Sequence, residues 1–363
     1  MRPFARRLRA WFAGQIEALY PGSFALVMAT GIISNAFFFE GHHALSDALF
    51  VANLVAYSVQ VVFIILRAIW FWRALWTDLV NPRLVFSFFT IVAATDVLGI
   101  GICLRGFQSV AQALWLFALI SWLVLIYFSF CVLAFLNTAH GADIADGGWL
   151  MAIVGTESLA ILGTVIVATL GDLGPSAFVL IHLLWGLGLA LYGIFIALFA
   201  YRIFFVDVRP GDITPSLWVV MGAAAISTNA GSALVLTESR IPFLQSMRPF
   251  IEGLTLTIWA WATWWIPLLL LFGIWKHIVC RVPLNYAPTF WSLVFPLGMY
   301  AVATSRLSLA ADFPPLQSLS RTMLWVALVA WAATALWLAV ASWQSFRNDI
   351  RSSDVEQRGP GEG

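Results

Sequence analysis

Charged residues are scarce in this chain: Asp, Glu, Lys and Arg make up only 10% of its 363 residues, against about a quarter in an average soluble domain. Because 61% of the residues are hydrophobic, a soluble fold could not cover its own surface with polar side chains. The formal net charge of +1 provides no basic field, so we expect no nucleic-acid partner. The composition predicts a polytopic integral membrane protein embedded in a lipid bilayer.

Cysteine, histidine and lysine are also few, and their positions exclude several kinds of site. The three cysteines lie in or beside apolar runs without a CxxC pair, which predicts small buried side chains rather than metal ligands. Of the five histidines only His182 lies well inside a hydrophobic run, whereas a b-type haem needs two axial histidines on facing helices. The single lysine, Lys276, lies at the end of a run, so a retinal Schiff base is not expected.

Sequence motifs for ATP-driven transport and for the common hydrolases are missing. The chain has no P-loop GK[ST], no HExxH and no GxSxG motif, each of which supplies a required phosphate cradle, metal site or nucleophile. We therefore expect no cofactor, no metal and no enzymatic activity. A non-transporting membrane enzyme or respiratory subunit is the least favoured alternative, and it would require a bound cofactor.

Ten hydrophobic runs follow one another along the chain, each long enough to cross a bilayer core of about 30 Å as a helix. Short connections between them make successive helices run antiparallel as hairpins. These runs predict an all-α integral membrane fold of ten transmembrane helices in residues 20–346, between a basic amphipathic leader at 1–19 and a polar tail at 347–363. The expected spans are 21–40, 48–73, 84–104, 110–135, 148–170, 176–204, 215–237, 249–275, 289–309 and 321–345.

The distribution of basic residues predicts the orientation. With the N-terminus inside, fourteen Lys and Arg residues fall on the cytoplasmic side and five on the other, which agrees with the positive-inside rule. We therefore expect a multi-pass protein of the cell membrane with both termini in the cytoplasm, most simply a bacterial inner membrane.

The odd-numbered and even-numbered spans differ in composition. The odd spans begin some 60 to 75 residues apart and contain most of the small and polar residues, whereas the even spans are richer in Leu, Ile, Phe and Trp. Small and polar residues belong where helices approach closely or water enters, and bulky apolar ones face lipid. This pattern predicts five repeated hairpins, with an inner ring of odd helices inside an outer ring of even ones.

Two carboxylates lie near the middle of odd spans: Asp96 in the third and Glu157 in the fifth. A charged side chain at that depth costs about 3 kcal/mol or more unless it is paired, hydrated or protonated. Two interpretations stay open. Either the pair takes part in proton coupling, or each is a protonated carboxyl that hydrogen bonds to a neighbouring helix.

The ninth span contains Phe295-Pro296. Proline removes a backbone hydrogen bond and clashes with the preceding turn, so Pro296 is expected to kink or break the helix near Phe295. Such a Phe is most often a core or lipid-facing residue. Arg306, at the outer end of the same span, either raises the local concentration of anions or is an arginine whose guanidinium reaches the interface, and the second reading is the plainer one.

Two sequence motifs resemble a known family. They are YPGSFALVMATGIIS at residues 20–34 and YAPTFWSLVFPLGMYAVAT at residues 286–304, and together they are similar to the tellurite-resistance/C4-dicarboxylate transporter family, which includes the slow-type anion channels. The resemblance covers about residues 20 to 345. It implies five hairpins in quasi-fivefold arrangement around a central pore, odd helices along that pore, a homotrimer, and a phenylalanine gate at Phe295 beside Pro296.

The resemblance implies transport of small anions, with C4-dicarboxylates such as malate or succinate as the leading substrates. A passive phenylalanine-gated channel, a proton-coupled dicarboxylate carrier and a tellurite or sulfite efflux protein remain alternatives. A mostly neutral pore would let hydroxyls, amides and backbone dipoles replace part of the anion's hydration shell. The pore-lining candidates are Thr30, Gly31, Ser34, Thr95, Asp96, Gly99, Gly155, Thr156, Glu157, Thr228, Asn229, Gly298 and Thr304.

Overall fold

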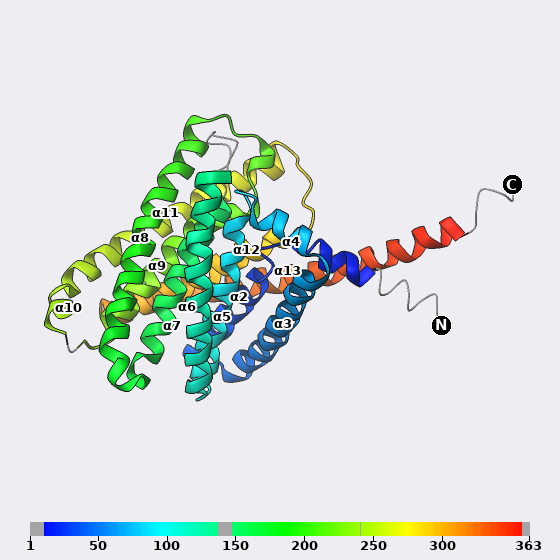
Figure 1. Cartoon of the computed structure of the whole chain (residues 1–363). Coiled ribbons are helices and arrows are strands. Elements are labelled where there is room, and N and C mark those ends of the chain that lie inside the picture. The colour runs from blue at the N-terminus through cyan, green and yellow to red at the C-terminus, as the bar shows by residue number, and fades with distance from the viewer. Residues whose placement is uncertain (1–10, 137–146, 240, 358–363) are drawn as a thin grey trace.

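The computed structural model describes residues 11–136, 147–239 and 241–357, and within these residues it contains helices and no strands (Figure 1). Nine of the described helices, counted with the 3-10 or π turns that continue them, are long and apolar enough to cross a membrane. The main helices are α2 (Ala25–Phe39), α3 (His43–Trp70), α5 (Phe89–Leu104), α6 (Gln108–Cys131), α7 (Met151–Ile166), α8 (Gly174–Phe205), α9 (Val219–Leu236), α11 (Arg248–Ile274), α12 (Trp291–Ala310) and α13 (Pro315–Gln357).

The first expected span, 21–40, is shorter in the structure than in the prediction. Helix α2 has 15 residues, which at 1.5 Å per residue extend about 22 Å, less than the hydrocarbon core of about 30 Å. Almost all of its residues from Ala25 to Phe37 are buried, so this helix is surrounded by other helices rather than by lipid. Two further short helices, α4 (Trp72–Leu79) and α10 (Pro242–Ser246), belong to the connections.

Burial separates the described helices into two groups. The most hydrophobic window is 72–89% buried in α5, α7, α9 and α12, and 11–39% buried in α3, α6, α8, α11 and α13. With α2, the buried group corresponds to the odd spans and the exposed group to the even spans, as the composition of the spans predicts. We call α2, α5, α7, α9 and α12 the inner helices, and α3, α6, α8, α11 and α13 the outer helices.

The inner helices contact one another in a closed cycle. Among the described elements, α2 packs on α5, α5 on α7, α7 on α9, α9 on α12, and α12 back on α2. Each outer helix lies against two neighbouring inner helices: α3 against α2 and α5, α6 against α5 and α7, α8 against α7 and α9, α11 against α9 and α12, and α13 against α12 and α2.

The first and last described segments meet on one side of the bundle. Residues 11–17 are helical and lie beside α13 (Figure 1). The Trp11 indole nitrogen lies 3.5 Å from Ser345 Oγ, and its ring lies 5.5 Å from the Phe346 ring. Both partners are near the end of the apolar part of α13, Pro315–Arg347. These residues belong to the expected leader, of which residues 1–10 lie outside the described part. The expected tail begins as a continuation of α13 through Gln357, and residues 358–363 lie outside the described part.

Candidate functional site: the inner face of α12 and the contacts of the inner helices

Helix α12 continues through Pro296 without a break. Of the two expected outcomes, a kink or a break, the break does not occur. The Pro296 ring packs against Gly222 of α9, where an added Cβ would lie 2.7 Å from Pro296 Cγ. Gly298 faces α2 instead, because a Cβ there would lie 2.9 Å from Ile32 Cγ2. These two close approaches determine which side of α12 faces each neighbour.

Phe295 lies on the side of α12 that faces away from the outer helices. Thr304 and Tyr300 face α11, where Trp259 Nε1 donates to Thr304 Oγ1 (3.0 Å) and the Tyr300 hydroxyl lies 2.8 Å from Thr263 Oγ1. At about 100° per residue, Phe295 falls on the opposite side, between the direction of α9 and that of α2. Its side chain is fully buried.

Each inner helix receives a hydrogen bond from an aromatic side chain of an outer helix. Four of these bonds end on threonine hydroxyls that also donate to a carbonyl one turn earlier in their own helix, so each hydroxyl is free to accept. The fifth ends on a backbone carbonyl. The pairs are Trp331 to Thr30 (2.9 Å), Tyr57 to Thr95 (2.9 Å), Trp122 to Thr156 (2.8 Å), Trp259 to Thr304 (3.0 Å) and Trp185 to Ser227 O (3.2 Å).

These bonds give four of the candidate threonines a role between helices. The hydroxyls of Thr30, Thr95, Thr156 and Thr304 are directed at outer helices and are occupied there. The sequence interpretation missed the donors, although a signal was present: a tryptophan in the middle of a span needs a partner for its indole N–H, unlike one in the interfacial belt. A single interhelical hydrogen bond in a membrane protein contributes about 0.6 kcal/mol on average.

The other polar candidates also contact neighbouring helices. Ser34 Oγ donates to Ser46 O of α3 (2.7 Å), and Asn229 Nδ2 lies 3.6 Å from Met299 Sδ of α12. Thr228 Oγ1 donates within its own helix, to Ala224 O (2.9 Å). One residue absent from the candidates, Asn35, joins two inner helices by donating to Val97 O of α5 (3.0 Å).

The candidate glycines are positions of close helix contact. A Cβ on Gly31 would lie 2.6 Å from Val97 Cγ1, one on Gly99 would lie 2.6 Å from Leu162 Cδ2, and one on Gly155 would lie 3.0 Å from Phe89 Cδ1. Each of these contacts joins neighbouring inner helices. Together with Gly298, they allow the inner helices to approach more closely than residues with side chains would permit.

Asp96 and Glu157 are fully buried at different interfaces. Asp96 Oδ2 accepts a hydrogen bond from Ser158 Oγ of α7 (2.7 Å), and its other oxygen has no partner. The Glu157 carboxyl lies against Gly188 of outer helix α8, at a place where a Cβ would collide with it. Ser227 lies near that carboxyl without a hydrogen bond of good geometry, because its hydroxyl donates to its own helix. The structure does not bring the two carboxyls together.

Neither carboxylate is paired with a cation of the part of the chain that the structure describes. Among the described residues, the ion pairs join other acidic residues to arginines, mostly near helix ends. An ionised carboxylate buried without a cation in a membrane interior would cost about 3 kcal/mol or more. The described residues also contain no group of three or more His, Cys, Asp or Glu side chains that could hold a metal ion.

The described helices and their burial define a multi-pass integral membrane protein, with its polar groups turned toward contacts between helices and with Phe295 on the inner side of α12. Residues 18–339 match the sequence model of the family described as voltage-dependent anion channel, so the chain belongs to this family. The match confirms the resemblance seen in the two motifs. Because the family consists of transporters and channels, membership agrees with the expectation that the chain is not an enzyme.

Relatives of the chain are themselves described as transporters or membrane proteins. Two uncharacterized transporters of Methanocaldococcus jannaschii are 26% and 25% identical over 317 and 326 residues, covering 85% and 87% of this chain and 90% and 91% of theirs. An uncharacterized membrane protein of Mycobacterium tuberculosis strain H37Rv is 44% identical over 131 residues, which is 36% of this chain. The chain spans 66% of that mycobacterial protein.

Proposed function

We propose that the protein transports small anions through a pore along the axis of the inner helices, and that Phe295 beside Pro296 closes this pore. The observation that carries the proposal is the position of Phe295, fully buried on the side of α12 opposite α11. The closed cycle of contacts among the inner helices supports a quasi-fivefold arrangement of five hairpins, with α2 as the first of ten transmembrane helices.

The proposed pore is mostly neutral. The threonine hydroxyls of the inner helices are held by outer-helix aromatics, and the Glu157 carboxyl is turned to α8. Passing anions would therefore meet apolar side chains and backbone dipoles rather than a cationic site that binds too tightly to release them. C4-dicarboxylates are the leading substrates, with tellurite or sulfite as the alternative cargo.

The assembly and orientation complete the proposal. We place the protein in a cell membrane, most simply a bacterial inner membrane, as a homotrimer of separate pores with both ends in the cytoplasm. The contact of Trp11 with the end of the apolar part of α13 supports an even number of crossings, because it puts the start of the first described segment and the end of the last span on one side.

The test compares anion flux into proteoliposomes for the wild type and Phe295→Ala, with malate, succinate, chloride and nitrate. We expect Phe295→Ala to raise flux at least about tenfold for one or more of these anions, equal to removing about 1.4 kcal/mol of barrier. The matched control is Phe37→Ala, which removes another fully buried ring whose edge packs on Trp325 of outer helix α13 (5.2 Å).

Phe37→Ala should leave flux close to the wild-type rate, because it opens a void beside an outer helix. Equal flux from Phe295→Ala and the wild type, with correct insertion of both, would refute the gate. A gain that Phe37→Ala reproduces would show a general loosening of the bundle instead.

A proton-coupled carrier is the second candidate, favoured by two buried carboxyls without a cation partner. Asp96→Asn and Glu157→Gln preserve shape while removing the titrating group. In a carrier that uses either residue, the substitution should abolish uptake driven by a pH gradient. In a passive channel, both variants should conduct much like the wild type, and the turn of Glu157 toward α8 favours this outcome for Glu157.

A further inference from the structure

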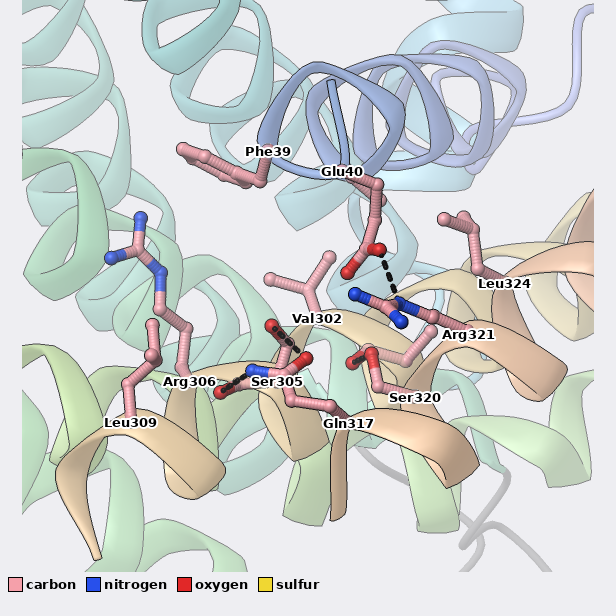
Figure 2. Close-up of a pocket in the computed structure, with 12 residues that line it drawn as sticks. Phe39, Glu40, Val302, Ser305, Arg306, Leu309, Gln317, Ser320, Arg321 and Leu324 are labelled. Atoms are coloured by element: carbon pink, nitrogen blue, oxygen red, sulfur yellow. Dashed lines mark hydrogen bonds and ion pairs between the residues drawn. The ribbon is translucent and has the colours of Figure 1, made fainter. Parts of the chain in front are cut away.

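A cavity of about 420 Å³ lies where the end of α2, the second half of α12 and the start of α13 come together (Figure 2). Its walls carry two arginines, Arg306 and Arg321, together with Ser305, Gln317 and Ser320. Glu40 is the only acidic side chain among the residues that line it. In the orientation proposed above, this is the non-cytoplasmic end of the bundle.

Arg306 differs from Arg105, Arg248 and Arg321, the other described arginines at this end, because no described residue pairs with it. Arg321 Nε donates to Glu40 Oε2 (2.7 Å), and Arg105 Nη2 donates to Asp47 Oδ1 (2.7 Å). The guanidinium of Arg306 makes neither a hydrogen bond nor an ion pair to the described residues. The lining therefore contains one positive charge that no carboxylate balances.

The packing of Arg306 leaves its hydrogen-bond donors available. Its guanidinium lies over the Phe39 ring, 4.5 Å from the centroid, a contact that uses the face of the planar group and leaves its N–H edges free. The residue is partly buried, so its charge is less screened than that of an arginine in open water. Figure 2 shows the side chain directed away from the Arg321–Glu40 pair.

Arg306 also lies on the same side of α12 as Phe295. The two residues are eleven positions apart, about three helical turns, which corresponds to a rise of about 16 Å. The cavity itself lies between α2, α12 and the outer helix α13, about three turns of α12 from Phe295 toward the non-cytoplasmic end. Nearby, Ser305 Oγ donates to Gln317 Oε1 (3.2 Å), an arrangement that holds the Gln317 amide against the wall.

We propose that this cavity is a binding site for a small carboxylate anion from the non-cytoplasmic solution, with the Arg306 guanidinium donating two parallel hydrogen bonds to the carboxylate from one of its free N–H edges. This proposal rests on the transport function proposed above and names the substrate class and the entry site. A planar guanidinium matches a carboxylate in two parallel hydrogen bonds. Anions bound there would be held at the non-cytoplasmic end, on the side of the bundle from which they would approach the gate at Phe295.

A purely structural role for Arg306 is the competing explanation. A cation near the C-terminal end of a helix interacts favourably with the helix dipole, and its stem can cover apolar surface. Such a role would keep α12 stable without binding any anion. Direct binding measurements separate the two roles, because only the proposed site requires affinity for a carboxylate.

The experiment measures binding of radiolabelled succinate by equilibrium dialysis against the full chain in nanodiscs of zwitterionic lipid. Arg306→Gln should weaken binding about tenfold, the effect of losing a charge-assisted contact. Arg306→Lys keeps the charge but not the fork, so it should give an intermediate affinity. The control is Arg248→Gln, which removes one positive charge at the same end from an exposed pair with Glu252.

Arg248→Gln should bind succinate like the wild type. No binding by the wild type, or equal loss in both Gln variants, would overturn the site, as would displacement of succinate by anionic lipid added to the nanodiscs. Flux measurements on the same proteins distinguish the two proposals. If Arg306→Gln transports succinate with the same apparent affinity as the wild type, only the binding site is refuted. If the wild type binds succinate but shows no flux, only the transport function is refuted.

Discussion

The contact between Gly222 of α9 and Pro296 of α12 provides a quantitative test of how tightly the inner helices pack beside the gate. A Cβ at Gly222 would lie 2.7 Å from Pro296 Cγ, 3.0 Å from its Cβ and 3.4 Å from its Cα, whereas ordinary contact begins at 3.4 Å. Gly222→Ala must therefore separate these groups by about 0.7 Å, the difference between 3.4 and 2.7 Å. Proline is rigid and its Cα belongs to the backbone, so the helices themselves have to move.

We expect Gly222→Ala to destabilise the protein by about 1–3 kcal/mol through overpacking, partly offset by a gain of up to about 1 kcal/mol because alanine favours helix. A shift at Pro296 also moves Phe295, so basal anion flux should rise. The measurements are the temperature at which half of the detergent-solubilised protein loses monodispersity, and flux into proteoliposomes.

Gly253→Ala in outer helix α11 is the matched control. It makes the same chemical change at a glycine whose Cβ would meet nothing within 4 Å, so only the helix-propensity gain remains. If Gly222→Ala were as stable as Gly253→Ala and neither variant raised basal anion flux above the wild-type rate, the close packing of α9 on α12 at Pro296 would be refuted.

Two further substitutions test polar contacts away from the gate. Thr156→Val keeps the side-chain shape but leaves the buried Trp122 indole without an acceptor, so it should cost about 1–3 kcal/mol; Ser121→Ala, at an exposed hydroxyl of the same outer helix, should change the melting temperature little. Asp78→Asn removes the charged partner of Arg67, whose side chain is only 4% exposed. It should cost about 1–3 kcal/mol, which would appear as a lower melting temperature. Exchanging the two residues, with Asp at 67 and Arg at 78, should not restore that temperature, because the buried site is shaped for the arginine at 67.

The number, order and burial of the helices were largely accessible from the sequence. The length of a hydrophobic run and its content of small residues are averaged over twenty or more positions, so a prediction based on them stays correct when a single residue is misinterpreted. The partial failure at 21–40 has a physical reason: a helix buried on all sides does not need the full bilayer length, and α2 has only 15 residues.

Side-chain direction was not accessible in the same way. Whether Thr156 faces a pore or an outer helix depends on the rotation of α7, and that rotation is decided by a partner, Trp122, 34 residues earlier. Gly31, Gly99 and Gly155 have the same ambiguity, since the sequence alone does not distinguish a glycine that makes a helix flexible from one that lines a pore or one that allows close helix contact. Glu157 likewise gives no sign that its neighbour is Gly188.

The bonds from outer aromatics to inner helices also order the assembly of the protein in time. The cycle of inner helices closes where α12 packs on α2. Outside it, α13 reaches α2 through Trp331 and Thr30, which are 301 residues apart, and through Arg321 and Glu40, which are 281 apart. During synthesis α2 is among the first helices to enter the membrane, and its lateral partner emerges last. Until then one side of α2 is covered only by lipid, so insertion of the C-terminal hairpin completes the wall of the bundle.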